Sequence, residues 1–170
     1  NNLKYLKGAE VIVVNDDPSA SIKDRLGKYE VKLIENPKNL GFAGSADKGI
    51  RSAKNNSIFL LNSDVKLLDD SYKTAVKKLE KNVFGIAFAQ KESDGSTVGK
   101  NKVFWKNGLL SHSKADDLEE GSTGWVEGGS SIISKDIYEK IGGLDTIFYP
   151  FYWEDIDLSY RARKYGYISW

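Results

Sequence analysis

The sequence predicts an α/β fold whose mostly parallel sheet is flanked by helices. Short apolar runs, each typical of a buried parallel strand, alternate with helical patterns through the first half of the chain. This alternation indicates βαβ units with right-handed crossovers. At 170 residues, without an internal repeat, the chain is expected to form one domain over residues 1–170 with a substantial core.

The expected strands are short apolar runs that stop at polar residues. Residues 11–14 read Val-Ile-Val-Val and stop at Asn15, and residues 58–61 read Ile-Phe-Leu-Leu and stop at Asn62. Because neither run alternates with polar residues, both are expected to be buried on two faces. The expected strands cover residues 10–14, 31–34, 58–61, 84–89 and 130–133.

Helical patterns lie between these strands. Gly8 ends a helix tail at residues 3–7, and the last helix presents apolar residues at i, i+3, i+4 and i+7 before Gly166 ends it. Residues 91–124 are polar and glycine-rich, and are expected to form loops, with a hairpin among them as the alternative. The other expected helices cover residues 20–28, 43–53, 67–79, 135–141 and 157–165.

Composition excludes several classes of function. Lys and Arg number 25 against 24 Asp and Glu, so no basic excess indicates a nucleic-acid surface. There is no Cys, and the single His112 excludes a multi-His zinc site and leaves little room for a Ser-His-Asp triad. No signal peptide or membrane-length apolar run is present, which favours a cytoplasmic location. The chain lacks Met and begins at Asn1, so we expect a piece of a longer or processed protein.

Two polar clusters stand at the ends of expected strands. Asn15, Asp16 and Asp17 follow the first strand, and Asn62-Ser63-Asp64 follows the third. Ligands of open α/β sheets bind beyond the carboxyl ends of the strands, so independent strands would deliver these side chains to one rim. The Asp64 carboxylate and an amide two positions earlier could hold a hard cation. Taken locally, ordinary turns explain both clusters equally well or better.

A third cluster lies near the C-terminus. Glu154, Asp155 and Asp157 follow three large aromatic residues that include Trp153. Partial desolvation by such rings raises carboxylate basicity, which suits a general base. The alternative is helix capping, since acidic residues are favoured in a first helical turn. His112 and the acidic stretch at residues 116–120 are expected to be solvated loop residues.

In their order along the chain, four segments resemble the GT-A-fold glycosyltransferases of family 2, particularly the rhamnosyltransferase-like members. The resemblance covers most of the chain except roughly residues 91–122. The segments are EVIVVNDDPS at 10–19, NPKNLGFAGSADKGIRSA at 36–53, IFLLNSDV at 58–65, and GGSSIISKDIYEKIGGLD with FYPFYWEDIDLSYRARKYGY at 128–145 and 148–167.

The resemblance implies roles for individual residues. Asp155 occupies the position of the catalytic base, with Glu154 beside it, and Asp64 occupies that of the ligand to Mg²⁺ or Mn²⁺. Asn15 stands where the family has its first Asp, and Asp47 where it has Asn. The residues implied in binding the nucleotide sugar are Asn15, Asp16, Asp17, Asn39, Gly41, Phe42, Asp47, Asn62, Gly128, Gly129 and Trp153.

The chain departs from the family at its two ends. The family's first strand, which carries nucleotide contacts, would precede residues 3–7, and further structure would follow Gly166. That strand would normally lie between residues 11–14 and 58–61, so their facing edges are expected to carry unpaired N–H and C=O groups. The 170-residue chain alone is therefore expected to be marginally stable, to self-associate or to rearrange, and to lack transferase activity.

The resemblance implies an inverting glycosyltransferase. Its donor would be a nucleotide-diphosphate sugar, and its acceptor a hydroxyl of a glycan or lipid-linked saccharide. The location would be cytoplasmic, with association at the inner face of a membrane left open. The alternatives are a nucleotidyltransferase, although no glycine-rich phosphate loop is evident, and a non-catalytic nucleotide- or glycan-binding module.

Overall fold

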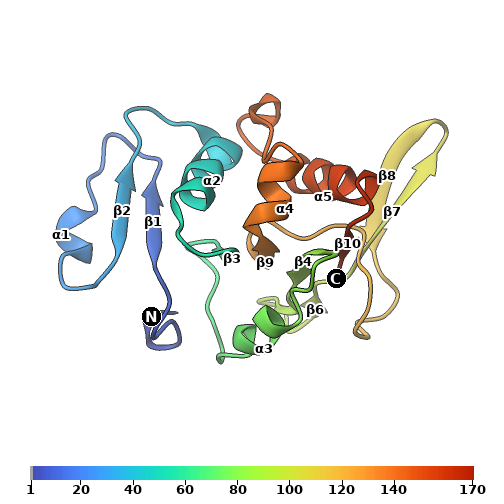
Figure 1. The fold of residues 1–170 in the computed structure, drawn as a ribbon, viewed down its shortest axis with the longest axis horizontal. Helices are drawn as coiled ribbons and strands as arrows, with labels where there is room; N and C mark the ends of the chain where they lie inside the picture. The colour runs from blue at the N-terminus through green and yellow to red at the C-terminus, as the bar shows by residue number, and fades with distance from the viewer. Residues whose placement is uncertain (1) are drawn as a thin grey trace.

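The computed structural model describes residues 2–170 as an α/β fold (Figure 1). Its strands are β1 (Ile12–Asn15), β2 (Lys32–Glu35), β3 (Ser57–Leu61), β4 (Val83–Ala87), β5 (Gln90–Lys91), β6 (Thr97–Val98), β7 (Asn101–Lys106), β8 (Leu109–Lys114), β9 (Ser130–Ser134) and β10 (Ile168–Ser169). Its helices are α1 (Lys23–Leu26), α2 (Gly41–Ser52), α3 (Tyr72–Lys77), α4 (Lys135–Lys140) and α5 (Glu154–Lys164), with short 3₁₀ helices η1 (Asn2–Lys4) and η2 (Thr146–Phe148). Each of the five expected strands is present.

The main strands form two sheets rather than one. β1 and β2 are a parallel pair, and the second sheet has the order β10-β4-β9-β3. β9 runs antiparallel to both β3 and β4, whereas β10 is parallel to β4. β3, β4 and β10 therefore all run in one direction, as a mostly parallel sheet requires. The expectation is wrong for β9, because both of its ladders are antiparallel. β9 follows a long excursion with two hairpins instead of a single crossover helix, so the rule for βαβ units does not apply to it.

The core lies on both faces of the four-stranded sheet. On one face, α2, α4 and α5 cover Phe84 and Ile133, and on the other, α3 covers Ile86 and Ile132 (Figure 1). All five residues of β9 are buried. Successive residues of β9 face the helices on opposite sides of the sheet, so every position is enclosed. This explains why β9 is an unbroken run of apolar and small residues.

Helix bounds differ clearly from expectation at four places. α1 is only Lys23–Leu26 rather than residues 20–28. α3 begins at Tyr72 rather than near residue 67, because the Leu67 N–H donates to the Asn2 side chain and the Ser71 N–H to that of Asp69. α5 begins at Glu154, three residues earlier than expected, and the expected helix tail at residues 3–7 is one short 3₁₀ turn. Among residues 2–170, none of the helices has the length and apolar character that crossing a bilayer requires.

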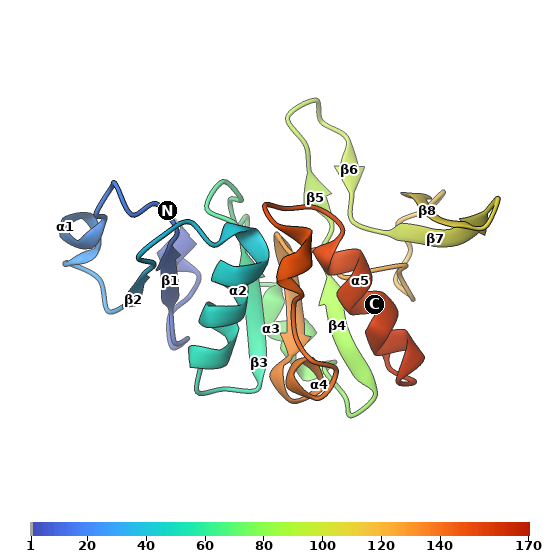
Figure 2. The same cartoon turned by 90° about the horizontal axis from the view of Figure 1, so that it is seen from above.

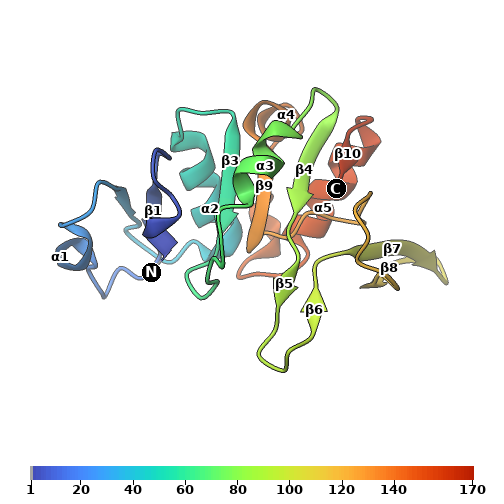
Figure 3. The same cartoon turned by 90° about the horizontal axis from the view of Figure 1, so that it is seen from below.

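Two hairpins replace most of the expected loop at residues 91–124. β5 pairs with β6, and β7 pairs with β8 from Asn101 opposite Lys114 to Lys106 opposite Leu109. Asn107 and Gly108 close the longer hairpin with φ of 53° and 78°, the positive values that a two-residue type I′ turn requires. Both hairpins project from the body, with β7–β8 at the end opposite α1 (Figures 2 and 3).

The two sheets lie side by side without a ladder between them. Across the molecule the order is β2, β1, β3, β9 and β4 (Figure 2), and among the described residues β1 pairs only with β2 and β3 only with β9. The expected unpaired edges are therefore present. All four residues of β1 are half-buried, and so are four of the five in β3, so the expectation that both runs are buried on two faces is wrong. With one open edge each, neither strand is fully enclosed.

Candidate active site

The site is built around a close approach of two strand ends. The Asn62 N–H, just after β3, donates to the Gly129 carbonyl at 2.9 Å, just before β9. A Cβ on Gly129 would lie 2.9 Å from Asn62 Nδ2, and one on Gly128 would lie 2.6 Å from the ring of Phe42. A Cβ at either position would force the Asn62 or Phe42 side chain to shift, so the Gly-Gly pair lets α2, β3 and β9 meet closely at this point.

Asp155 lies at this point, in the first turn of α5. Its Oδ2 accepts from the Gly128 N–H at 3.3 Å, and its Oδ1 accepts from the Ile156 N–H at 2.8 Å. Burial, reinforced by the nearby carboxylates of Glu154 and Glu127, raises the pKa of Asp155 to about 6 despite these two donors. A carboxylate with such a pKa is mostly ionised at neutral pH yet more basic than usual, as a general base requires.

Glu154 occupies a different environment. It is 6% exposed, and its Oε2 has no hydrogen-bond partner among the described residues. An unpaired buried carboxylate oxygen is costly. Its charge is one of the causes of the raised pKa of Asp155. The geometry therefore gives the adjacent acids different surroundings, with backbone donors on Asp155 and none on Glu154 Oε2.

The aromatic residues before α5 hold a strained backbone. Tyr152 and Trp153 have φ of 81° and 76°, values that residues with side chains rarely adopt. The Trp153 ring contacts the edge of His112, with centroids 5.2 Å apart, and His112 makes a similar contact with Trp125 at 5.3 Å. His112 is exposed as expected, but it lies in β8 rather than in a loop.

The start of α2 is tied to the same region. Gly41 has a φ of +70°, and a Cβ there would lie 2.6 Å from the Pro150 carbonyl oxygen. That oxygen accepts from the Phe42 N–H at 3.1 Å. The Asn39 side chain accepts from the Gly41 N–H at 3.0 Å. The loop that precedes α5 therefore rests directly on the N-terminus of α2.

The cluster after β1 is largely occupied by its own turn. Asn15 donates from its side chain to the Ala20 carbonyl and accepts from the Asp17 N–H, while Asp17 accepts twice from Ser19. These contacts are the local turn that the sequence offered as the alternative. A hollow of about 320 Å³ nevertheless remains at the ends of β1 and β2, lined by Asn15, Asp17, Pro18, Ala20, Ser21, Glu35, Asn36 and Pro37.

Asp16 joins this cluster to α2. It accepts from the Leu40 N–H and from the Asn36 side chain, each at 2.8 Å. Burial alone would raise the pKa of Asp16, but these donors and Ser45 outweigh it and leave the pKa lowered. Asp16 is therefore a fixed charge that holds the loop leading into α2.

Two further predicted residues lie in contrasting surroundings. Asp47 accepts from Arg51 at 2.9 Å and from the Tyr138 hydroxyl at 2.7 Å, so partners within the fold engage it and the structure does not join it to Asp155. Asp64 is exposed, and its side chain has no partner among the described residues. No group of three or more His, Cys, Asp or Glu residues within 2–170 could enclose a metal.

The Asp64 side chain suits a partly protein-bound cation. The exposed Asp64 carboxylate supplies hard oxygen ligands, and Asn62 stands two residues earlier in the chain, but these are too few to complete the shell of Mg²⁺ or Mn²⁺. Oxygens of a bound diphosphate would have to complete it. Within residues 2–170 the protein therefore offers only this free carboxylate here, and a metal would need oxygens of the nucleotide.

Sequence reasoning missed Glu127. Its two oxygens accept from Asn101 at 3.0 Å and from Gln90, and its charge contributes to the pKa of Asp155. The one available signal was its place directly before the Gly-Gly pair. Its partners come from β5 and β7, whose positions the sequence left undefined.

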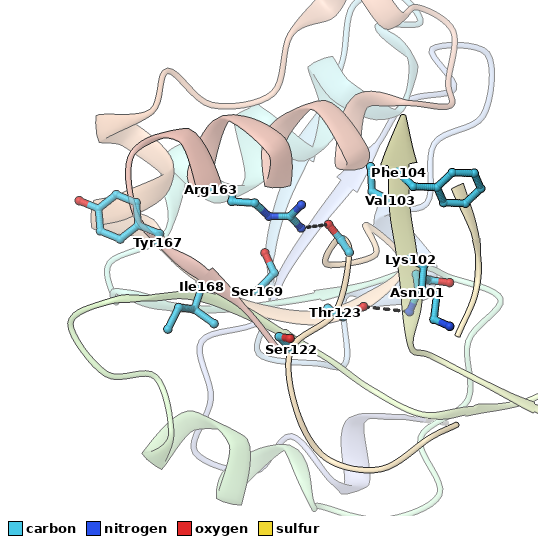
Figure 4. A pocket seen from close by; sticks show the side chains of 11 residues that line it. Asn101, Lys102, Val103, Phe104, Ser122, Thr123, Arg163, Tyr167, Ile168 and Ser169 are labelled. Carbon is cyan, nitrogen blue, oxygen red and sulfur yellow. Dashed lines mark hydrogen bonds between the residues drawn. The ribbon is translucent and has the colours of Figure 1, made fainter. Parts of the chain in front are cut away.

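A larger hollow lies elsewhere. It measures about 550 Å³ and lies between the base of β7, residues 122–124 and the C-terminal end of α5 (Figure 4). Arg163 crosses it to donate to the Gly124 carbonyl at 2.8 Å. None of the residues predicted for the site lines it, so its size does not make it the centre of the chemistry.

Solved structures share this fold. GalNAc-T7, determined with UDP, GalNAc and Mn²⁺, aligns over 99% of this chain and 37% of its own, with a TM-score of 0.72 and 17% identity. The mannosyltransferase PcManGT from Pyrobaculum calidifontis, determined with GDP-Man and Mn²⁺, aligns over 99% of this chain and 48% of its own, with a TM-score of 0.66 and 14% identity. The expected GT-A architecture is therefore confirmed.

Sequence comparison leads to the family. The low-salt glycan biosynthesis hexosyltransferase Agl10 of Haloferax volcanii is 23% identical over 166 residues, covering 92% of this chain and 54% of the relative. The chain thus spans about half the length of that relative. The profile of the family described as glycosyl transferase family 2 matches residues 2–142, most of the sequence. The chain belongs to glycosyl transferase family 2.

Proposed function

We propose that this chain is the catalytic part of an inverting hexosyltransferase. It would transfer a sugar from a nucleotide-diphosphate donor to a hydroxyl of a glycan or of a lipid-linked saccharide. The Haloferax relative is named a hexosyltransferase of glycan biosynthesis, and the two structural neighbours were solved with UDP and GalNAc or with GDP-Man. These names support the class of donor and acceptor. Family membership favours glycosyl transfer over the nucleotidyltransferase alternative.

The observation that carries the proposal is the environment of Asp155. It lies at the meeting point of α2, β3, β9 and α5, and burial raises its pKa to about 6. In a single displacement, the acceptor oxygen bonds to the anomeric carbon while the bond from that carbon to the diphosphate oxygen breaks. The hydroxyl proton passes to Asp155 Oδ, and the configuration inverts. One carboxylate base is sufficient for this route.

The donor would lie along the rim from β1 to β3. The hollow at the ends of β1 and β2 would receive the nucleoside, with Asn15 and Asp17 at its wall. The position of α2 would be fixed mainly by Asp16, Asn39, Gly41, Phe42 and Asp47. The sugar would be bordered by Gly128, Gly129, Asn62 and Trp153. These roles rest on the contacts above and on the resemblance of the motifs.

Asp64, with Asn62 two residues earlier in the chain, would hold Mg²⁺ or Mn²⁺. When bound, the cation would neutralise charge on the departing nucleoside diphosphate. The presence of Mn²⁺ in both structural neighbours supports this use of a metal. Asp64 would contribute a ligand that is already free of internal contacts.

Two measurements test the proposal in sequence. Calorimetry with UDP, GDP and other nucleoside diphosphates, with and without Mn²⁺, asks whether the chain binds the donor's leaving group. Turnover of nucleotide sugars by the longest stable form of the protein, followed by analysis of the product's anomeric configuration, asks whether it transfers with inversion. Metal-dependent binding with inverted product is the expected result. Retention of configuration, or no nucleoside diphosphate binding in an active form, would reject the proposal.

A further inference from the structure

The β7–β8 hairpin presents an unusual tip. Phe104, Trp105 and Leu109 are 42%, 64% and 72% exposed, at the end of the molecule opposite α1 (Figure 3). The tight Asn107-Gly108 turn brings Leu109 opposite Lys106. Large apolar side chains are therefore concentrated at the outermost point of a projecting ribbon.

The two faces of this hairpin differ. Val103 and His112 are opposite one another, and His112 packs against Trp125 and Trp153 of the body. Successive residues of a strand point to opposite faces, so Lys102, Phe104 and Lys106 share the other face. Figure 4 shows Phe104 on the side of β7 away from Arg163. The outward face therefore combines an aromatic ring with basic side chains.

The charge of the hairpin has one sign. Residues 101–114 contain Lys102, Lys106 and Lys114 and no Asp or Glu. Lys102 is paired with Asp116 at the hairpin's base, whereas Lys106 at the tip has no partner among the described residues. The unpaired positive charge is therefore on the same face of the tip as Phe104 and Leu109, whereas Trp105 points to the other face.

We propose that the tip of the β7–β8 hairpin, with its basic outward face, binds the surface of an anionic lipid bilayer. Trp, Phe and Leu insert at the boundary between headgroups and acyl chains, while Lys attracts anionic headgroups. Membrane binding scales with the apolar area that inserts, so even a few exposed apolar side chains contribute, whereas a stable protein interface buries on the order of 1,000 Å² or more. The size of the patch thus favours a bilayer over a protein partner.

Binding there would orient the active site. His112 links the hairpin to Trp153, the residue immediately before the turn of α5 that carries Asp155. A hairpin anchored in a membrane would hold that helix at a fixed height and tilt above the lipid. An acceptor carried by the same membrane would then be presented in a constant orientation. The inference itself concerns lipid binding and is independent of turnover.

The test is co-sedimentation of the purified chain with vesicles of phosphatidylcholine alone or with added phosphatidylglycerol. The chain should bind more strongly to the anionic vesicles. Trp105→Ser/Leu109→Ser should lower the partition coefficient at least about tenfold, since two large apolar groups would stay in water. Lys106→Glu should weaken binding only where phosphatidylglycerol is present.

The matched control is Leu68→Ser/Tyr165→Ser, which removes side chains that are 62% and 59% exposed elsewhere on the surface. It should bind like the parent. A parent chain that stays in the supernatant, or a tip variant that binds as well as the parent, would overturn the proposal. So would sedimentation velocity without lipid in which the tip variant abolishes self-association, because the patch would then join two copies of the chain.

Discussion

The four-stranded sheet and the β1–β2 pair offer the same kind of apolar run but enclose it differently. Every residue of β9 is buried between helices on both faces, whereas every residue of β1 is half-buried beside an open edge. The raised pKa of Asp155 arises at the enclosed side, where desolvation is strong. The polar residues after β1 are held by turn contacts and border an open hollow. Enclosure thus tunes the proposed base, while the open side offers room for a ligand.

The sharpest test of the enclosed side is Asp155→Asn in a preparation that turns over. Turnover should fall by about 10²–10⁴, the usual contribution of a general base, with little change in nucleotide affinity. Asp136→Asn is the matched control, since Asp136 lies in the first turn of α4 but is exposed. Near-normal turnover of the Asp155 variant would move the role to Glu154 or Asp157.

Equal truncations should distinguish the two sheets in stability. Ile133→Ala removes a side chain that is 1% exposed and should lower the free energy of unfolding by about 2–5 kcal/mol. Ile12→Ala, in half-buried β1, should cost on the order of 1 kcal/mol. Urea unfolding of both variants measures the difference. Equal losses would mean that β1 is enclosed in solution, as self-association through its edge would achieve.

The buried carboxyl should also make stability depend on pH. The pKa of Asp155 is raised in the folded protein to about 6 from an ordinary value of 3.8, so the folded state binds the proton more tightly. Its contribution to stability is therefore complete below about pH 4 and is lost as pH rises through about 6. Relative to the parent, Asp155→Asn should gain about 2–3 kcal/mol in free energy of unfolding between those limits. A pH-independent difference between the two proteins would contradict the raised pKa.

The open rim yields the smallest expected effect. Asp64→Ala should weaken Mn²⁺-dependent binding of a nucleoside diphosphate at least about tenfold, because it removes the one carboxylate ligand of an incomplete shell. Metal-independent binding should be unchanged. Asp24→Ala, at another exposed acid, is the control. Equal affinity of parent and Asp64 variant in calorimetry would reject the metal role.

Local sequence patterns predicted where the strands lie, but not how the strands pair with one another. The runs at residues 58–61 and 130–133 were identifiable because apolar and small residues stop at polar ones. Their antiparallel pairing was not, because it depends on the path of the chain between β4 and β9. Asn107-Gly108 is a sequence signal for a two-residue hairpin turn within residues 91–124, where the expectation was only of loops and a hairpin of undefined position.

For the candidate site, too, the sequence indicated the residues but not their contacts. The proximity of Asp155 and Gly128, and of Gly129 and Asn62, was implied only by the family resemblance. The contacts themselves depend on the close approach that two glycines permit. Two features could not be predicted from the sequence, because both depend on where the hairpins lie. They are the effect of the Glu127 charge on the pKa of Asp155 and the contact between His112 and Trp153.

The most direct test of the central claim is a titration of the Asp155 carboxyl carbon by NMR, assigned with Asp155→Asn. We predict a midpoint near pH 6, because burial beside Glu154 and Glu127 outweighs the two backbone donors. In an active preparation, the acid limb of kcat should fall at a similar pH. A midpoint near 4, the ordinary value for Asp, would show that the carboxyl is solvated and would contradict its assignment as a base tuned by burial.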